Sequence, residues 1–399
     1  MSRLLQTVVV PADLRVLALL PSLRAALSGG GPALLPVGTA GAAPALLRPD
    51  TPLADGEDDP DDPTVAVLAT SGSTGDPKGA LLPASALLAS ASATHDRLGG
   101  PGRWLLALPA HHVAGLQVLV RSLVTGTVPT VLDLGDGFDP GAFAEAAAQV
   151  RGPRRYTALV PTQVRRLLDA GGRPLAALAG FDAVLVGGAA TTAGLRAEAE
   201  AAGVRVVTTY GMSETCGGCV YDGVPLDGVR VELDPPDGRV RLGGPTVARG
   251  YRGGHGPADA FTAHDGVRWF RSDDLGTLDG GRLEVLGRAD DLVVTGGLKV
   301  APGPVEAALL RLPGVVEAVV VGIEDEEWGQ RVVAAVVVRP GEPAPTLVAV
   351  RSAVRAEVAA HAAPRQLLVL DRLPLRGPGK PDRAEIARLA AKEAGRPAV

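Results

Sequence analysis

The chain has 399 residues, of which 39 are basic and 44 acidic, so its formal net charge is -5. This balance excludes a protein that mainly covers nucleic-acid phosphates or anchors on an anionic membrane surface, because both need a basic surface. Apolar residues make up 46% of the chain, which excludes wholesale disorder and, at this length, predicts two or three domains or subdomains.

The N-terminal segment does not look like a targeting signal, because Pro11, Asp13 and Arg15 interrupt its apolar run. The longest uncharged stretch, 25–47, is broken by Gly and Pro and is too weakly apolar to span a bilayer. Two cysteines cannot build a disulfide framework. We therefore expect a cytoplasmic protein with no membrane span and no nucleic-acid partner.

Only four of the basic residues are lysines, at positions 78, 299, 380 and 392. A composition that favours arginine this strongly makes each remaining lysine a candidate for a role that a planar guanidinium cannot fill. The first three of these lysines lie in glycine-rich loops.

Short apolar runs alternate with amphipathic stretches between residues 65 and 208. The apolar runs, predicted as strands, are 65–69, 104–108, 128–132, 156–160, 183–186 and 204–208. The stretches predicted as helices are 84–97, 115–123, 140–150, 163–170 and 193–202. This alternation is typical of α/β layers with a largely parallel sheet. The acidic run 55–63, which precedes the first of these strands, is expected to be a solvated loop.

The texture of the sequence changes twice after this region. Residues 229–286 read as short strands with Gly/Asp turns, as in a small barrel or antiparallel sheet. Beyond 287–291, strands at 315–321 and 332–338 and helices at 347–360 and 382–394 predict a compact α+β domain of about 110 residues.

The segment Thr70–Gly79, expected between a strand and a helix, has the composition of a phosphate-binding loop. Its glycines let the backbone approach a ligand, its hydroxyls donate hydrogen bonds, and Lys78 supplies a point charge. It is not a Walker loop, because Pro77 precedes the lysine and Gly79 follows it. The simpler alternative is a flexible Gly/Ser turn. The residues of the loop that we expect to contact phosphate are Thr70, Ser71, Gly72, Ser73, Thr74, Gly75 and Lys78.

This loop resembles the signature of the adenylate-forming superfamily, which includes acyl-CoA synthetases, luciferases and nonribosomal peptide adenylation domains. The segment Tyr210–Thr215 is similar to the Tyr-Gly-x-Thr-Glu motif of the same superfamily, and Gly211 belongs to it. The resemblance implies that Tyr210 stacks on adenine, Ser213 contacts the α-phosphate and Glu214 binds Mg²⁺. The turn that resembles the superfamily's adenine-binding turn consists of Gly187, Gly188 and Ala189.

Three further motifs follow in the family order. The resemblance of 271–276 to Thr-Gly-Asp-Leu-Gly aligns Asp274 with the carboxylate that binds both ribose hydroxyls, while Asp273 stands where the family has Gly. It further implies that Arg288 reaches the ribose or phosphate, that Asp290 is the pivot between two domains, and that Lys380 bridges the carboxylate and the phosphate during adenylation. The loop implied for the later thioester step contains Gly296, Gly297 and Lys299.

Taken with these motifs, the fold class expected is α/β, with a large N-terminal adenylate-forming domain and a small mobile α+β C-terminal domain. The first combines α/β layers with a small barrel-like subdomain. The expected bounds are 1–287 for the N-terminal domain, 288–291 for the hinge and 292–399 for the C-terminal lid.

The acyl pocket is expected where the family places it, after the strand at 104–108 and beside the Tyr210 motif. The residues assigned to it by resemblance are His112, Gly115, Gly217 and Gly218. Cys216 and Cys219 form a C-x-x-C spacing, but there is no second cysteine pair, so we do not expect them to bind metal or to act in redox chemistry.

The resemblance implies an enzyme that condenses an acid with ATP, releases pyrophosphate and then transfers the acyl group. Coenzyme A is the expected acceptor, because no carrier domain is predicted. The strings 107–123 and 210–229 look like the actinobacterial form of o-succinylbenzoate–CoA ligases, which act in menaquinone biosynthesis. Its substrates would be ATP, CoA and an aromatic dicarboxylic acid, and a homodimer is compatible with the sequence.

Other functions stay open at this point. They are a CoA ligase for another aryl or medium-chain acid, a stand-alone adenylation enzyme that loads a carrier protein, a nucleotide-binding regulator without catalysis, and a nucleoside triphosphatase that releases ADP.

Overall fold

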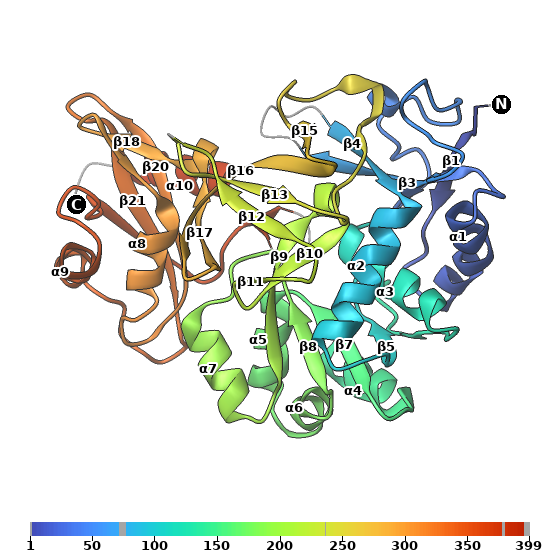
Figure 1. The fold of residues 1–399 in the computed structure, drawn as a ribbon. Helices are drawn as coiled ribbons and strands as arrows, with labels where there is room; N and C mark the ends of the chain where they lie inside the picture. Colours follow the sequence, from blue (N-terminus) through green and yellow to red (C-terminus); the bar gives the residue numbers. More distant parts are fainter. Residues whose placement is uncertain (1, 72–76, 236, 377–379, 395–399) are drawn as a thin grey trace.

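The computed structural model describes residues 2–71, 77–235, 237–376 and 380–394. For Ser71, Arg376, Lys380 and Ala394 it describes the backbone only. The α/β architecture with a smaller α+β region at the C-terminus, expected from the sequence, is confirmed (Figure 1).

A first sheet joins the N-terminal segment to the predicted phosphate loop. Its strands, in spatial order, are β1 (Leu5–Val9), β2 (Ala33–Val37), β3 (Thr64–Ser71), β4 (Pro77–Pro83) and β14 (Gly250–Tyr251). The first three are parallel, whereas β4 and β14 are antiparallel to their neighbours. Helix α1 (Leu20–Leu27) covers this sheet with Leu23 and Ala26.

The described ends of the phosphate loop belong to two antiparallel strands, β3 and β4, so the sequence analysis missed a strand between this loop and the predicted helix. Thr70 pairs with Lys78 and Ser71 pairs with Pro77. Helix α2 (Ala84–Arg97) begins only after β4. The reason is that residues 80–82 are apolar and buried between β3 and β14, and such a short run carries no periodicity that separates a strand from a helix start.

Whereas the strand predicted at 65–69 belongs to the first sheet, a second sheet contains the predicted parallel strands from residue 104 onward. In spatial order it contains β11 (Val224–Pro225), β10 (Gly217–Tyr221), β9 (Val206–Met212), β8 (Ala183–Val186), β7 (Arg155–Leu159), β5 (Arg103–Leu106) and β6 (Thr130–Val131). Strands β9, β8, β7, β5 and β6 run parallel, and β10 and β11 are antiparallel additions.

Helices cover both faces of this sheet. The outer helices are α4 (Pro140–Gln149), α5 (Pro161–Ala170), α6 (Gly172–Ala179) and α7 (Ala193–Ala201), whose apolar side chains share one core with β7 and β8. Helices α2 and α3 (Val113–Val124) pack in another core that includes residues of both sheets. They therefore lie between the first and second sheets (Figure 1).

A third, antiparallel sheet follows, as the change of texture after residue 229 predicted. Its strands are β12 (Arg230–Leu233), β13 (Arg239–Gly243), β16 (Val267–Asp279), β15 (Phe261–His264) and β17 (Arg282–Arg288). The long strand β16 pairs with three of the others, so Asp273 and Asp274 are held in its middle.

The C-terminal region has its own sheet, made of β18 (Val293–Thr295), β19 (Leu298–Val300), β20 (Val315–Asp325), β21 (Gly329–Val338) and β22 (Gln366–Leu370). Helices α8 (Pro302–Leu309) and α9 (Leu347–Glu357) pack on one face, and α10 (Arg383–Ala394) packs on the other. A short hairpin, β23 (Leu375–Arg376) and β24 (Lys380–Pro381), precedes α10. Figure 1 shows this region beside β17, on the far side of the molecule from β1.

The acidic run 55–63 is not simply the solvated loop that the sequence predicted. Glu57 is only 6% exposed and pairs with Arg252, which is fully buried. Asp58 pairs with Arg3, and Asp62 accepts hydrogen bonds from Ser85 at the start of α2. The carboxylates thus connect the acidic run to the N-terminal segment, to the turn that follows β14 and to α2. Their partners are distant in sequence.

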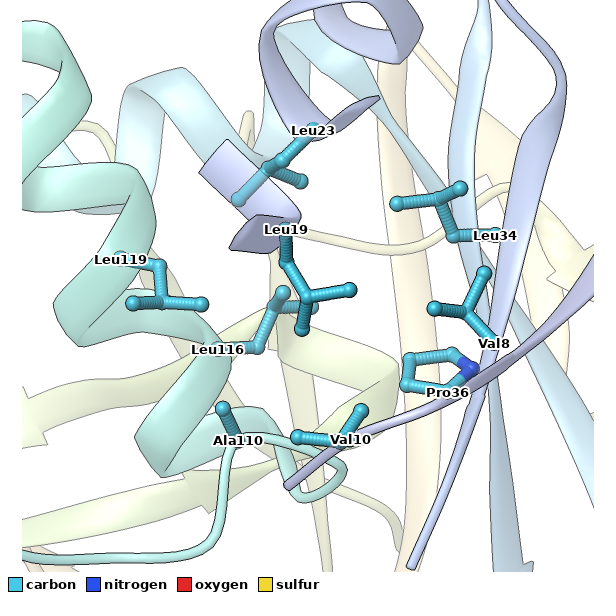
Figure 2. Close-up of a pocket in the computed structure, with 9 residues that line it drawn as sticks. All are labelled: Val8, Val10, Leu19, Leu23, Leu34, Pro36, Ala110, Leu116 and Leu119. Atoms are coloured by element: carbon cyan, nitrogen blue, oxygen red, sulfur yellow. The ribbon is translucent and has the colours of Figure 1, made fainter. Parts of the chain in front are cut away.

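A small apolar cavity separates α3 from the first sheet (Figure 2). It is lined by Val8, Val10, Leu19, Leu23, Leu34, Pro36, Ala110, Leu116 and Leu119. With about 10 Å³ of free space and no polar lining group, it is a packing void and not a substrate site. Within the described ranges, no helix has the length and apolar character that crossing a membrane requires.

Candidate nucleotide and acyl site

Lys78 lies at the base of the phosphate loop, on β4. Its backbone carbonyl accepts a hydrogen bond from Thr70 Oγ1 at 3.3 Å, and its Nζ lies 5.6 Å from the centroid of the Tyr251 ring. The expected loop residues Gly72, Ser73, Thr74 and Gly75 lie outside the described residues. The described part of the loop therefore places the ammonium group of Lys78 next to Tyr251 on β14.

Glu214 lies on the other side of Tyr251. It belongs to the 3-10 turn Ser213–Thr215 that follows β9, and it is 7% exposed. The Tyr251 hydroxyl donates to Glu214 Oε1 at 2.8 Å. Burial raises the pKa of Glu214, while the hydrogen bond from Tyr251 and the charge of Lys78 oppose this shift. Lys78, Tyr251 and Glu214 therefore form one continuous polar group.

Glu214 is suited to share a metal ion with a ligand. Among the described residues, no group of three or more His, Cys, Asp or Glu side chains could hold a metal by itself. Mg²⁺ is usually bound through one or two carboxylates together with substrate phosphates. A single buried carboxylate next to a phosphate loop fits that pattern.

Tyr210 and Asp274 meet across the second and third sheets. The Tyr210 hydroxyl donates to Asp274 Oδ2 at 2.8 Å, and burial raises the pKa of both groups. Asp273 has a different environment, because it pairs with Arg239 and with Arg288 Nη2. Of the two adjacent aspartates, Asp274 is therefore the one that faces Tyr210.

The turn after β8 lies against the segment that carries Tyr210. A Cβ atom at Gly187 would collide with Thr209 Oγ1, and Gly188 has a φ of +80°. Ala189 follows in the same turn and is half-buried. Because β8 and β9 are parallel neighbours, their carboxyl ends place this turn next to Tyr210, which is where open α/β sheets bind ligands. Gly211 allows the close approach of β10, since a Cβ there would collide with the Gly217 carbonyl.

Arg288 connects this group to the predicted hinge. It ends β17, and its Nε donates to Asp290 Oδ1 at 2.8 Å. Its Nη1 lies 3.9 Å from Asp274 Oδ1. We use the name nucleotide half for the group Lys78, Glu214, Tyr251, Tyr210, Asp274 and Arg288. A cavity of about 300 Å³ adjoins it, lined among others by Lys78, Tyr251, Arg239, Arg271 and Asp273.

The two remaining lysines of the predicted machinery belong to the C-terminal region. Gly296 and Gly297, with φ of +57° and +76°, form the turn between β18 and β19. Lys299 is exposed on β19, in a sheet to which no residue of the nucleotide half belongs. Lys380 precedes Arg383 by three residues in the chain. Arg383 Nε lies 3.1 Å from Oδ2 of Asp291, the residue that follows the predicted pivot Asp290.

The acyl-pocket candidates lie at the N-terminal end of α3 and on the neighbouring strand β10. His112 precedes α3 and is exposed, with its ring 4.3 Å from that of His111. Gly115 faces the Pro109 carbonyl, with which a Cβ would collide, so packing alone requires glycine there. Gly217 faces α3, since a Cβ at this position would lie 3.3 Å from Gln117 Cγ. Gly218, on the same strand, faces Thr209 and Tyr221.

The structure defines the surroundings of Arg121, which the sequence offers, together with Arg165, only as an unassigned candidate for holding a second carboxylate. Arg121 lies on α3 on the same face as Val113 and Gln117 and is only 3% exposed. Its Nη2 donates to Thr94 Oγ1 at 3.2 Å and lies 3.5 Å from the Tyr221 hydroxyl. It has no carboxylate partner among the described residues, and its Nε is buried without a hydrogen bond there. The spacing of four residues between Val113, Gln117 and Arg121 predicts that they share one face of α3, but it does not show that the charge of Arg121 is buried. We use the name acyl half for the interface between α3 and β10.

The two cysteines belong to this interface. Both are fully buried, and burial raises the pKa of Cys219 to about 12. The Cys216 carbonyl accepts hydrogen bonds from Gln117 Nε2 at 2.7 Å and from Ser90 Oγ at 3.1 Å. This environment is typical of structural thiols, since a reactive thiol needs a lowered pKa.

Two family profiles match the chain: "AMP-binding enzyme" over residues 36–252 and "AMP-binding enzyme C-terminal domain" over residues 304–380. A probable 2-succinylbenzoate–CoA ligase of Mycobacterium tuberculosis is 51% identical over 96% of this chain and 98% of its own length.

Solved structures agree with the fold. MatB from Rhodopseudomonas palustris with bound ATP has a TM-score of 0.81 at 24% identity, over 99% of this chain and 90% of that one. The o-succinylbenzoate coenzyme A synthetase MenE from Bacillus subtilis, in complex with ATP and magnesium ion, has a TM-score of 0.68 at 28% identity, over 81% of this chain and 70% of that one. The chain belongs to the AMP-binding enzyme family.

Proposed function

We propose that this enzyme is an ATP-dependent acid–CoA ligase whose acid is 2-succinylbenzoate, a substrate of menaquinone biosynthesis. In the first step a carboxylate oxygen attacks the α-phosphorus of ATP, and the bond to pyrophosphate breaks. In the second step the thiol of coenzyme A attacks the acyl carbon, and AMP leaves. The 51% identity to a probable 2-succinylbenzoate–CoA ligase, over nearly the whole of both chains, supports this assignment.

The nucleotide half supplies the groups for the first step. Lys78 and the phosphate-loop backbone would hold the phosphates, and Ser213 would contact the α-phosphate. Tyr210 would stack on adenine beside Gly187, Gly188 and Ala189. Asp274 would accept from the ribose hydroxyls, because it is the aspartate that faces Tyr210. Positive charge fixed around the reacting oxygens stabilises the charge that develops in the transition state.

Mg²⁺ would be held by Glu214 and by phosphate oxygens of the nucleotide. When bound, it supplies charge neutralisation at the phosphates. Tyr251 keeps the Glu214 carboxylate oriented for this role, since its hydroxyl donates to Oε1 at 2.8 Å. The same hydrogen bond lowers the pKa of Glu214 and so favours the ionised form that a cation needs.

The observation that carries the substrate class is the buried cation at the acyl half. Arg121 faces β10 in line with Gln117, whose neighbour across the interface is Gly217. A buried guanidinium without a carboxylate partner is costly unless a ligand supplies the counter-charge. Arg121 would therefore clamp the carboxylate of 2-succinylbenzoate that is not activated.

The second step would require a rotation of the C-terminal region about Asp290. Lys380 would serve adenylation and Gly296, Gly297 and Lys299 would serve thioester formation. The pivot would lie where β17 ends and the C-terminal region begins, next to Arg288, whose Nε donates to Asp290 Oδ1 at 2.8 Å.

Acid-dependent ATP–pyrophosphate exchange, followed by CoA consumption, tests the proposal. We expect 2-succinylbenzoate to yield AMP, pyrophosphate and an acyl-CoA much faster than benzoate or octanoate. Equal rates for the three acids would refute the substrate assignment. Exchange without CoA consumption would favour an enzyme that loads a carrier protein, and ADP as the product would exclude the adenylate chemistry.

The cellular setting is part of the proposal. ATP and coenzyme A are cytoplasmic co-substrates, so we expect the enzyme in the cytoplasm. The nucleotide half and the acyl half are both built from one chain, so the reaction as proposed needs one subunit, and a homodimer stays a prediction from the sequence.

A further inference from the structure

The buried cation Arg121 rests on an aromatic ring that is itself anchored. The guanidinium carbon lies 4.9 Å from the centroid of the Trp104 ring, and Trp104, on β5, is 1% exposed. Tyr156 packs against the same indole with ring centroids 5.2 Å apart. A cation above an indole face is attracted by the ring quadrupole most strongly when both are removed from water, so the position of this ring matters for Arg121.

A histidine on α2 fixes the orientation of that indole. Trp104 Nε1 donates to His95 Nε2 at 3.2 Å, and His95 is 4% exposed. Because Nε2 accepts, the proton of the neutral imidazole is on Nδ1. Burial and, to a lesser degree, the charge of Arg121 lower the pKa of His95 to about 4, so the ring remains a neutral acceptor at neutral pH.

The hydroxyl groups around Arg121 are oriented without neutralising it. Thr94 Oγ1 uses its only proton to donate to the Ser90 carbonyl at 2.8 Å, so it accepts from Arg121. The contact between Thr94 and the Tyr221 hydroxyl, at 2.9 Å, must then have Tyr221 as donor. The guanidinium therefore meets two neutral acceptors and one π face, which position its charge without neutralising it.

We infer that Trp104 and His95 are positioning residues that hold the Arg121 guanidinium for the second carboxylate of the acid, and that they set the preference of the enzyme for dicarboxylates. This inference rests on the proposed function of Arg121 as the clamp. Neither residue needs to touch the substrate, because the hydrogen bond orients the indole and the indole orients the cation.

The experiment measures a preference ratio in the intact enzyme. This ratio is kcat/KM for 2-succinylbenzoate divided by kcat/KM for the better of 2-butyrylbenzoate and 3-benzoylpropionate, each of which lacks one of its carboxylates. We expect His95→Leu to lower the ratio about tenfold, through the KM of the dicarboxylate, because the indole N–H loses its acceptor. His95→Gln offers an amide oxygen in its place and should keep the ratio within about twofold of wild type.

Trp104→Phe provides a second variant that keeps a ring under Arg121. It loses the indole N–H, and we expect the ratio to fall about three- to tenfold. Its matched control is Trp269→Phe, since Trp269 is equally buried and carries Arg241 over its ring at 5.2 Å in the third sheet. This control should leave the ratio unchanged, and thermal melting verifies that each variant is folded.

Two different results would overturn the inference: one concerns His95 and Trp104, and the other concerns Arg121 itself. If folded His95→Leu and Trp104→Phe lose activity equally with the dicarboxylate and with both analogues, the two residues are merely structural. If the wild-type enzyme itself shows no preference for the dicarboxylate, the clamp function of Arg121 fails, and the inference fails with it.

Discussion

The nucleotide half and the acyl half hold their charged groups in opposite ways. In the nucleotide half, Glu214 is hydrogen-bonded by Tyr251 and faces Lys78, and Asp274 is hydrogen-bonded by Tyr210 and lies near Arg288. In the acyl half, Arg121 is surrounded by neutral groups and has no carboxylate partner among the described residues.

This difference indicates how the charge of each half is balanced before a ligand binds. The nucleotide half balances its charges without ligand, so the proposed ATP–metal complex would exchange one set of partners for another. The acyl half holds a cation that no carboxylate of the described residues compensates, which lowers the stability of the fold but would leave an oriented charge for the proposed second carboxylate. The predictions below test whether the two halves really differ in this way.

The largest effect is expected at Lys380. Lys380→Ala should lower the rate of acyl-AMP formation by about a hundredfold to a thousandfold, because a fixed cation at the reacting oxygens is lost. Thioester formation from supplied acyl-AMP should remain largely intact, and rapid-quench assays of the two half-reactions measure this difference. Lys392→Ala, on the exposed face of α10, is the control and should affect neither step. An equal loss in both half-reactions would contradict the rotation mechanism.

Arg121→Leu should separate activity from stability. We expect the KM for 2-succinylbenzoate to rise about a hundredfold, while the free energy of unfolding increases by about 1–3 kcal/mol, because a buried unpaired charge is removed. Enzyme kinetics and urea denaturation measure the two quantities. Arg165→Leu is the control, since Arg165 forms partly exposed ion pairs with Asp169 and Glu198 and should change neither quantity strongly. A destabilised Arg121→Leu with unchanged KM would show that Arg121 is a structural residue.

The adjacent aspartates provide a smaller test within the nucleotide half. Asp274→Asn should raise the KM for ATP about tenfold, since a charged acceptor for ribose hydroxyls becomes neutral. Asp273→Asn, whose side chain instead pairs with Arg239 and Arg288, should change it less than about threefold. Steady-state kinetics with varied ATP compare the two, and the reverse order would show that Asp273 is the ribose ligand.

The smallest expected effect is a shift in pH dependence. Burial raises the pKa of Glu214, and the hydrogen bond from Tyr251 lowers it, so Tyr251→Phe should raise it further. If the ionised carboxylate holds Mg²⁺, the acid limb of kcat/KM for ATP should move to higher pH in this variant. A raised carboxyl pKa means that the folded state binds the proton more tightly, so acid does not unfold the protein through this group. An acid limb that is unchanged, or that moves to lower pH, would show that the ionisation of Glu214 does not determine this limb.

The sequence offers more specific signals for the nucleotide half than for the acyl half, for a physical reason. Phosphate and metal recognition need specific residue types at short spacing, so Lys78 and Glu214 each stand inside a motif that can be recognised. The resemblance already aligns Asp274 with the ribose site. The structure adds that the side chains of Asp273 and Asp274 have different partners, and that Asp274 is the one that meets Tyr210, since adjacent strand residues point to opposite faces of β16.

Other features could not be predicted because their partners are distant in sequence. Glu57 looked like part of a solvated acidic run, yet Arg252 buries it from nearly two hundred residues away. Strand β4 was missed because its short apolar run forms a strand only by pairing with β3 and β14, and the sequence does not show this pairing. Arg121 is one arginine among many, and only the packing of α3 against β10 and β5 shows that it is buried with no counter-charge among the described residues.

The most direct test of the central claim is a cycle that combines the Arg121→Leu variant with the removal of one substrate carboxylate. The measurement is kcat/KM in ATP–pyrophosphate exchange for wild type and Arg121→Leu, each with 2-succinylbenzoate and with the better of its two single-carboxylate analogues. We predict a coupling of about 2–3 kcal/mol, so that the wild-type preference for the dicarboxylate disappears in the variant. A coupling near zero, with the same preference in both proteins, would contradict the proposal that Arg121 recognises the second carboxylate.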